Sequence, residues 1–293
     1  MKTTGERFIP GQGGVIELEH LNRYYFVVHQ IDITDKTVLD IASGEGYGSN
    51  ILAKHASRVI GVDISSEAIE HAKKKYQANN LEFIQGSVIE IPLTDNSVDV
   101  VVSFETLEHH DKHDEMMLEI KRILNNNGIL IISSPDKYYY SELPGIKNDF
   151  HVKELYYDEF EELMKRHFEY TYFFSQRAFN GSMIVLNENG EKFKSPIIFS
   201  EEGLAKDFVP LYNIGIGTND LSFSLENNIV IYQNCEDILT NVDIENARED
   251  GFQRGMNHIR KTKYYRIGKF ILRPFSRFKK GIYVIYHNLF TKQ

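Results

Sequence analysis

A dense group of acidic and imidazole side chains follows an apolar run, in the stretch Phe104-Glu-Thr-Leu-Glu-His-His110. Histidine has an ordinary pKa of about 6.5, so His109 could accept a proton from a substrate group. His151, just before a predicted helix, is the second candidate for that role. Carboxylates and imidazoles are also ligands of divalent cations, so Glu105, Glu108, His109 and His151 could instead hold a metal ion.

A glycine-rich loop follows the apolar run Val38–Ile41, with glycines at the alternate positions 44, 46 and 48. Glycine allows a sharp turn and a close ligand approach, and the helix that opens after the loop supplies free N–H groups. The next apolar run ends at Asp63, whose carboxylate could bind both hydroxyls of a ribose. Ser49 breaks the dinucleotide pattern G-x-G-x-x-G, so the loop favours a different nucleoside ligand.

The pattern Asp40-x-x-x-Gly44-x-Gly46-x-Gly48, followed by Asp63, resembles the first motif of class I S-adenosylmethionine (SAM) methyltransferases. The resemblance implies SAM as the methyl donor and S-adenosylhomocysteine as the product. At the third strand end, Ser87 stands where many of these enzymes carry an aspartate that binds the adenine amino group. The resemblance assigns SAM binding to Tyr24, Asp40, Ala42, Ser43, Gly44, Glu45, Gly46, Gly48, Asp63, Ile64, Gly86, Ser87, Val88, Phe104 and Glu105.

The N-terminal segment is similar to the entrance of a bacterial methyltransferase group often associated with cell-surface polysaccharide assembly. The residues that carry this similarity are Gly5-Glu-Arg-Phe-Ile-Pro10, Glu19-His20 and Arg23-Tyr24. It implies that Tyr24, with His20 or Arg23, lines the SAM pocket. The alternative is a surface helix on which Glu19 and Arg23 form an i,i+4 ion pair.

The stretch E-x-x-E-H also occurs at this place in many class I methyltransferases, which implies that Glu105 and His109 orient the loop and the cofactor. Together with His151 it resembles the divalent-cation site of the small-RNA 2′-O-methyltransferases and, in part, of the ubiquinone-pathway O-methyltransferases. Orientation, proton transfer and metal binding therefore all remain open. We predict His109 and His151 as the catalytic residues and assign no set of metal ligands.

Composition narrows the class of protein. The 293 residues are 42% hydrophobic, which supports a real core, and they contain no transmembrane-length apolar run. The lone Cys235 excludes an internal disulfide, and with no apolar signal region at the N-terminus this favours a cytoplasmic protein.

Eleven of the 33 Lys and Arg residues follow residue 252 and all 42 Asp and Glu precede it, so residues 1–252 carry a net charge of −20. So acidic a body argues against long nucleic acid as the substrate.

Alternating apolar runs and amphipathic segments predict an α/β fold: a Rossmann-like, mostly parallel sheet with an antiparallel last strand and helices on both faces. We expect an N-terminal lid at 1–36, a SAM-binding domain at 37–235 with an insertion around 177–227, and a helical tail at 236–293. A left-handed cap is expected at 125–128 and a helix at 152–167. The last antiparallel strand is expected from one of the segments 181–186, 210–217 and 228–232.

The tail mixes cations with large apolar rings over residues 264–290. That composition suits a peripheral contact with an anionic membrane face. A segment that docks on the acidic body, a partner protein or a second copy would have the same composition, so the oligomeric state stays open.

The sequence thus predicts a SAM-dependent methyltransferase whose acceptor is a hydroxyl of a sugar or surface-glycan precursor. An O- or N-methyltransferase of a small metabolite is the first alternative. A SAM-binding scaffold of a glycan-synthesis assembly, without catalysis, is the second.

Overall fold

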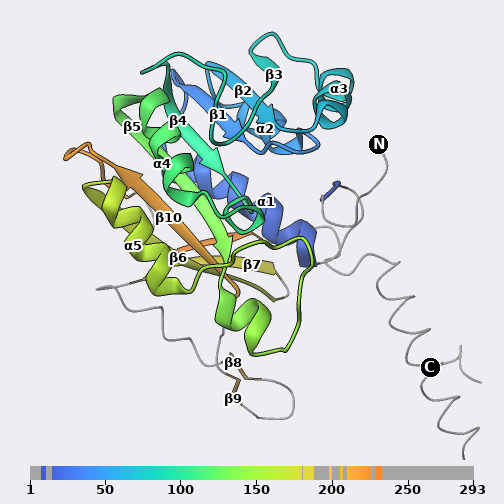
Figure 1. The fold of residues 1–293 in the computed structure, drawn as a ribbon, viewed down its shortest axis with the longest axis vertical. Coiled ribbons are helices and arrows are strands. Elements are labelled where there is room, and N and C mark those ends of the chain that lie inside the picture. The colour runs from blue at the N-terminus through green and yellow to red at the C-terminus, as the bar shows by residue number, and fades with distance from the viewer. Residues whose placement is uncertain are drawn as a thin grey trace, which may run out of the picture. The chain divides into compact units, whose positions relative to one another are not determined.

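The computed structural model describes residues 8–10, 15–179, 181–187, 198–199, 205–206, 210–225 and 229–232, all in the first of two compact units of the chain (Figure 1). The helices are α1 (Val15–Gln30), α2 (Tyr47–Leu52), α3 (Ser66–Lys75), α4 (His113–Ile123) and α5 (Tyr157–His167), with short helical turns η1 (Leu107–His109) and η2 (Tyr138–Glu142). The strands are β1 (Thr37–Ile41), β2 (Arg58–Asp63), β3 (Leu81–Gln85), β4 (Val98–Ser103), β5 (Leu124–Pro135), β6 (Tyr170–Phe179), β7 (Gly181–Leu186), β8 (Ile198–Phe199), β9 (Ala205–Lys206), β10 (Tyr212–Thr218) and β11 (Ile229–Tyr232).

One nine-stranded sheet organises the described residues, in the order β11-β7-β6-β10-β5-β4-β1-β2-β3. The pairs from β3 to β5 are parallel, whereas β10 runs antiparallel to both β5 and β6. This confirms the predicted mostly parallel sheet with helices on both faces. All three segments proposed for the last antiparallel strand join the sheet: β10 lies inside it, and β7 and β11 extend it beyond β6.

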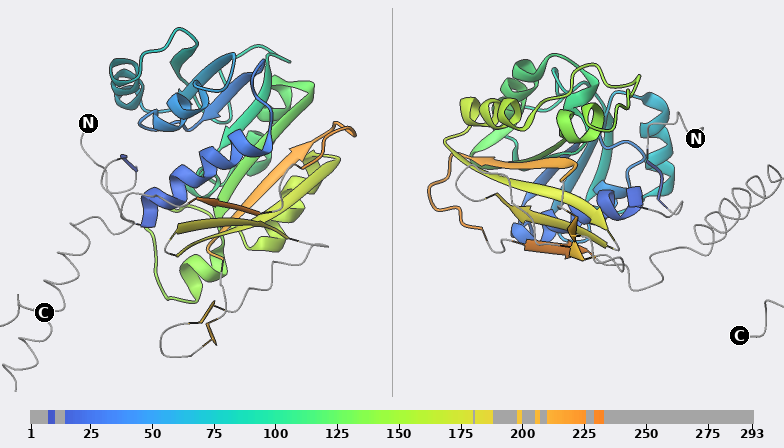
Figure 2. Two further views of the ribbon diagram at one scale, coloured as in Figure 1. Left: turned by 180° about the vertical axis from the view of Figure 1, so that it is seen from behind. Right: turned by 90° about the horizontal axis from the view of Figure 1, so that it is seen from below.

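The helices cover the two faces of the sheet in separate groups (Figure 2). Helices α4 and α5 pack with Leu39, Ile60 and Val101 into one core cluster. On the opposite face α1 and α2 pack with neighbouring strand positions such as Val38 and Val100. Because adjacent positions of these strands point to opposite faces, their near-continuous apolar runs fill both cores.

Two local expectations were wrong. No left-handed cap follows α4: Leu124 is already extended and pairs with Val98, so β5 begins where the helix ends. Gly128 is needed for space, since a Cβ there would lie 2.7 Å from Leu124 Cδ2. The helix expected at 152–167 begins only at Tyr157, because the preceding segment pairs Leu155 with Asp136.

Helix α1 is buried rather than a surface helix. Glu19, Arg23 and Tyr24 are all buried, and the helix contacts α2 together with β6, β7 and β11. Gly48 allows one of these contacts, since a Cβ at this position would lie 1.9 Å from Tyr24 Cζ.

No helix in the described part of the chain combines the length and apolar character that crossing a membrane requires. The tail 236–293, Cys235 and residues 1–7 lie outside the described residues. The predictions made for them, and the domain boundaries, therefore stay predictions.

We predict that Gly48→Ala destabilises the protein by about 1–3 kcal/mol, because the new methyl group overlaps the Tyr24 ring. Urea unfolding of the wild type and the variant measures this cost. The same substitution in a Tyr24→Ala background is the matched control, where most of the cost should disappear. An equal cost in both backgrounds would show that the Tyr24 contact is not the cause.

Candidate functional site

The glycine loop and three other strand ends meet at one edge of the sheet, because β1, β2, β3 and β4 are parallel. Two non-glycine residues with a positive φ lie at this edge, Ala42 at 58° and Glu105 at 52°. Such backbone is costly outside glycine and concentrates at functional sites. The strained positions directly follow β1 and the end of β4, where the sequence predicts ligand contacts.

Asp63 ties the glycine loop to the end of β2. Its carboxylate accepts hydrogen bonds from the backbone N–H groups of Gly44 and Ser65, each at 2.8 Å. Each carboxylate oxygen has a further lone pair, so Asp63 can still accept hydrogen bonds from a pair of hydroxyls. Ile64 beside it is 73% exposed, and the nearby Ser43 hydroxyl is buried with no hydrogen-bond partner among the described residues. An exposed apolar side chain and a buried hydroxyl without a hydrogen-bond partner are typical of a ligand-binding surface.

One predicted loop contact, Glu45, has a side chain that bonds α3 and the residue after it. The buried Glu45 carboxylate accepts hydrogen bonds from His71 at 3.1 Å, from Lys75, and from the Tyr76 hydroxyl at 2.7 Å. Its side chain therefore holds the loop against α3 and its C-terminal end. Gly46, with φ 92°, provides the turn into α2.

The third strand end contributes less polar chemistry than the other three. The Gly86 N–H donates to the Asp63 carbonyl at 3.1 Å. The Ser87 hydroxyl accepts from Ile89 N–H at 3.4 Å, while Val88 packs against the core. Side-chain recognition by this segment would therefore rest on the Ser87 hydroxyl.

Asp40 lies fully buried under the loop. It accepts hydrogen bonds from the Ser49 hydroxyl at 2.6 Å and the Tyr24 hydroxyl at 3.2 Å. Burial raises the pKa of Asp40 to about 7, and these hydrogen bonds oppose the rise only in part. The Tyr24 ring stands edge-on to the rings of Tyr47 and Phe104, so α1, the loop and the end of β4 share one aromatic contact.

A buried charge cluster lies next to this aromatic contact. The Arg23 guanidinium donates to Gln176 Oε1 at 2.7 Å, lies 3.5 Å from Glu105 Oε1, and stacks on the Tyr212 ring at 4.4 Å. Its two terminal nitrogens have no hydrogen-bond partner among the described residues. Burial raises the pKa of Glu19 in the same cluster, against the field of Arg23.

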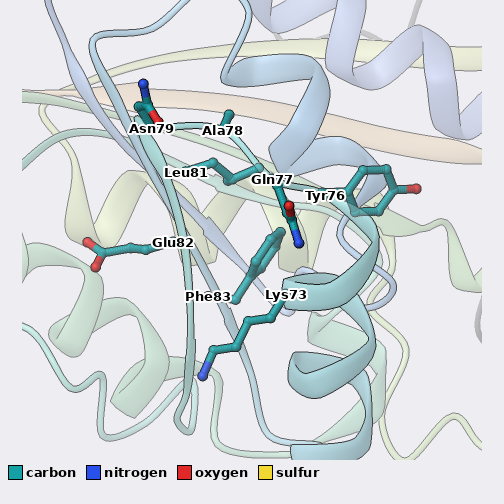
Figure 3. Close-up of a pocket in the computed structure, with 8 residues that line it drawn as sticks. All are labelled: Lys73, Tyr76, Gln77, Ala78, Asn79, Leu81, Glu82 and Phe83. Carbon is teal, nitrogen blue, oxygen red and sulfur yellow. The ribbon is translucent and has the colours of Figure 1, made fainter.

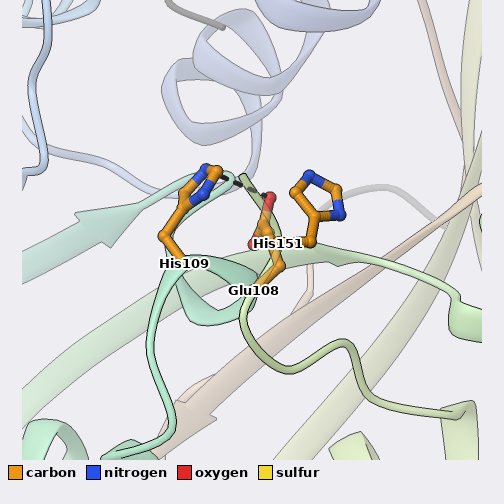
Figure 4. A group of neighbouring side chains, drawn as sticks. All are labelled: Glu108, His109 and His151. Carbon is orange, nitrogen blue, oxygen red and sulfur yellow. Dashed lines mark ion pairs between the residues drawn. The ribbon is translucent and has the colours of Figure 1, made fainter. Parts of the chain in front are cut away.

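The 3₁₀ turn after β4 and the connection after β5 lie side by side at this edge. Figure 4 shows Glu108 between His109 and His151, with ligand atoms of all three within 4.8 Å of one another. Glu108 is buried, and burial raises its pKa, with the Glu105 charge adding to the rise. The structure therefore brings together the two histidines that the sequence selected, although they are 42 residues apart.

Neighbouring oxygens hold both imidazoles in place. His109 Nδ1 lies 3.3 Å from the Phe150 carbonyl. His151 Nδ1 bonds the Glu154 carboxylate, and its ring stacks on Tyr140 at 5.5 Å between ring centroids. The backbone N–H groups of Val152 and Lys153 donate to the Glu108 carbonyl, which joins the two segments.

Several residues here carried no signal in the sequence. Ser133 fixes Glu105 by donating to its carboxylate at 2.7 Å, and Glu154 fixes His151. Tyr212 reaches the site from β10, which follows β5 by many residues. Of these contacts, the one between His151 and Glu154 could have been predicted. The two residues are three positions apart at the start of a segment expected to be helical, where such a pair can interact.

A groove near α3 and β3 is lined by none of the predicted site residues. Figure 3 shows its lining, which includes Lys73, Tyr76, Glu82 and Phe83 at the end of α3 and the start of β3. Two of its residues also contact the glycine loop, because the Tyr76 hydroxyl donates to Glu45 and the Phe83 ring packs against Gly46.

Comparison with known proteins identifies the family. Residues 33–194 match the family model described as a methyltransferase domain. A Mycobacterium tuberculosis protein named as a probable S-adenosylmethionine-dependent methyltransferase is 36% identical over 171 residues, or 55% of this chain and 58% of that protein. A relative in Mycolicibacterium smegmatis, with a similar name, is 35% identical over 168 residues, covering 55% and 63%. The chain thus spans about three fifths of these relatives.

Among solved structures, a SAM-dependent methyltransferase from Thermotoga maritima, titled a possible histamine N-methyltransferase, matches with a TM-score of 0.51 at 21% identity. The match covers 70% of this chain and 91% of that one, and it bears on the fold alone. With the family match spanning more than half of its length, the chain belongs to the methyltransferase-domain family. The sheet is the Rossmann-like one of class I methyltransferases, and SAM is the cofactor this family implies.

The residues at the edge fit SAM. Gly44, with φ 56°, has no side chain to obstruct a ligand, and Asp63 offers acceptors for ribose hydroxyls. The buried Ser43 hydroxyl and the terminal Arg23 nitrogens, which have no hydrogen-bond partner among the described residues, would gain partners from a polar amino-acid group.

We predict that Asp40 makes stability depend on pH. Its folded pKa of about 7 exceeds the ordinary value of 3.8, so the folded state holds the proton more tightly. Its contribution is complete below about pH 4 and is lost as the pH rises to about 7. The unfolding free energy of Asp40→Asn relative to wild type should therefore rise over that interval in ligand-free protein, as measured by denaturant unfolding. A constant difference would contradict the raised pKa.

Proposed function

We propose that the protein transfers the methyl group of SAM to a hydroxyl oxygen of a sugar or surface-glycan precursor. The observation that carries this proposal is the meeting of a nucleoside-type loop and a histidine cluster at one sheet edge. In the reaction the S–CH₃ bond breaks and an O–CH₃ bond forms. The products are S-adenosylhomocysteine, the methyl ether and a proton.

On the donor side, Asp63 would hold the ribose hydroxyls, and the exposed Ile64 beside it would pack on the adenine. The buried Arg23 would pair with the carboxylate of the methionine part, because its terminal donors have no hydrogen-bond partner among the described residues. The Phe104 ring, edge-on to Tyr24, would face the sulfonium, a cation that an aromatic ring attracts.

On the acceptor side, the cluster of Glu108, His109 and His151 would hold the acceptor hydroxyl and remove its proton. His151 is the better placed of the two histidines, since Glu154 fixes its ring orientation. Such proton removal is needed for a hydroxyl, which is a poor nucleophile while it keeps its proton. In-line transfer also needs the hydroxyl oxygen roughly 3–3.5 Å from the methyl group.

The glycan part of the proposal rests on the entrance motif of the N-terminal segment. A lipid acceptor is the second candidate, because weaker relatives bear lipid names. A fatty-acid O-methyltransferase of Mycolicibacterium smegmatis is 27% identical over 130 residues. A phthiotriol/phenolphthiotriol dimycocerosates methyltransferase of Mycobacterium tuberculosis is 29% identical over 111 residues.

Incubation with methyl-labelled SAM and a panel of acceptors tests the function. We expect label in nucleotide-sugars or lipid-linked glycans and none in fatty acids. Label in fatty acids alone would favour the second candidate. SAM binding with no labelled product from any acceptor class would instead point to a non-catalytic scaffold.

We predict that Asp63→Asn weakens SAM binding by roughly 10- to 100-fold, since charge-assisted hydrogen bonds to the ribose are lost. Isothermal titration calorimetry measures the affinity. Glu82→Gln, which changes an equal charge on β3 away from the site, is the matched control and should bind SAM like the wild type. Unchanged affinity in Asp63→Asn would remove Asp63 from the donor site.

We predict that His151→Gln lowers turnover by roughly a hundredfold or more, the usual size of an acid–base contribution, while SAM affinity stays unchanged. Labelled-methyl transfer and calorimetry give the two readouts. The control is His55→Gln, an exposed histidine after α2, which should leave both unchanged. A parallel loss of SAM affinity would mean that His151 supports the donor pocket instead.

A further inference from the structure

We infer that Glu108, His109 and His151 bind a divalent transition-metal ion at the acceptor side of the sheet edge. The binding of the ion is independent of the proposed function. Only the role of the ion toward the acceptor hydroxyl rests on that function. The binding of the cation is measurable without either substrate.

The first argument is convergence. Glu108 and His109 come from the 3₁₀ turn after β4, and His151 comes from the connection after β5. Their ligand atoms lie within 4.8 Å of one another, with His109 Nε2 at 3.9 Å from Glu108 Oε1 (Figure 4). Backbone hydrogen bonds from Val152 and Lys153 to the Glu108 carbonyl hold the two segments in this register.

The second argument is the state of the carboxyl group. Glu108 is 1% exposed, and its Oε2 has no hydrogen-bond partner within the described ranges. A buried carboxylate oxygen without a partner is costly, and a cation is the most effective partner it can gain.

The third argument is the orientation of the rings. Both histidines bond an oxygen through Nδ1, His109 at the Phe150 carbonyl and His151 at the Glu154 carboxylate. An imidazole that donates Nδ1–H to an oxygen presents a lone pair on Nε2. On His151 this nitrogen lies 2.9 Å from the Asn148 side-chain amide, and a cation would replace that hydrogen bond. Carboxylates and carbonyls behind the ring commonly orient metal-binding histidines in this way.

The ligand set indicates the class of ion. Two imidazoles and one carboxylate suit Zn²⁺, Fe²⁺, Co²⁺ or Mn²⁺ better than Mg²⁺ or Ca²⁺, which prefer all-oxygen sites. Bond lengths of about 2.0–2.2 Å require ligand atoms roughly 3–3.5 Å apart. A closure of roughly 1–2 Å between the most distant ligand atoms would therefore complete the site.

Three protein ligands leave coordination positions open. An acceptor hydroxyl bound there would become more acidic, which is the chemistry such an ion supplies. His109 and His151 would then promote loss of the hydroxyl proton by holding the ion, and neither would accept that proton itself.

The experiment is titration of chelator-treated, dialysed full-length protein with Co²⁺ and with Zn²⁺, followed by calorimetry and by visible absorption of Co²⁺. We expect one equivalent per chain and a Co²⁺ spectrum that differs from that of the aqueous ion, with much weaker binding of Mg²⁺. Glu108→Gln, His109→Asn and His151→Asn should each weaken binding at least tenfold. Glu154→Gln, which keeps all three ligands, should weaken it by roughly 10- to 100-fold.

His55→Asn is the control for adventitious binding to an exposed imidazole and should bind like the wild type. Unchanged thermal unfolding and SAM affinity in the variants would show that they fold. Equal cation binding by the wild type and the Glu108→Gln/His109→Asn/His151→Asn triple variant would overturn the inference. SAM binding and methylation would remain measurable in that case, so the proposed function would stand or fall separately.

Turnover of the metal-depleted protein tests the acceptor role. Recovery on adding Co²⁺ or Zn²⁺ would support it. Full turnover without the ion, in protein that still binds Co²⁺, would refute the acceptor role and leave the binding site.

Discussion

The site depends first on the carboxylate of Asp63, which receives backbone N–H groups from the glycine loop and from the start of α3. One side chain thereby links the glycine loop after β1 to the end of β2 and the start of α3. Glu45 adds a second connection from the loop to the far end of α3. Since both carboxylates hold backbone or helix positions, the loop is shaped before any ligand arrives, and little ordering remains to oppose binding.

The remaining side of the edge depends on buried polar contacts that cross the sheet. Ser133 at the end of β5 orients Glu105, and Glu105 faces Arg23 from α1. Arg23 in turn bonds Gln176 on β6. Breaking one member of such a network leaves the others buried without partners, which costs more than a surface ion pair. This network therefore links α1 to the ends of β4 and β5 and to β6.

Much of this arrangement could be predicted from the sequence, because it follows from short-range patterns. The apolar runs of β1, β2, β3 and β4 could be recognised in the sequence, and the glycine loop follows the first of them. The end of α4 could not be recognised, because Asn125–Gly128 is typical of a helix cap and only pairing with β4 makes that region a strand. The burial of Arg23 and the Glu154 contact of His151 depend on residues distant in the chain or on a loop path, which periodicity does not encode. The fold and the donor loop were therefore predictable, and the supporting contacts of the site were not.

Two consecutive residues of α1 serve opposite halves of the sheet: Tyr24 bonds Asp40 in the parallel half, and Arg23 bonds Gln176 on the other side. A substitution that shifts this helix must therefore disturb both halves at once. On the proposed function, directed evolution toward new acceptors would begin in the connection after β5, where Tyr140 and His151 stack. Substitutions there would alter acceptor selectivity and leave the residues proposed to bind SAM unchanged.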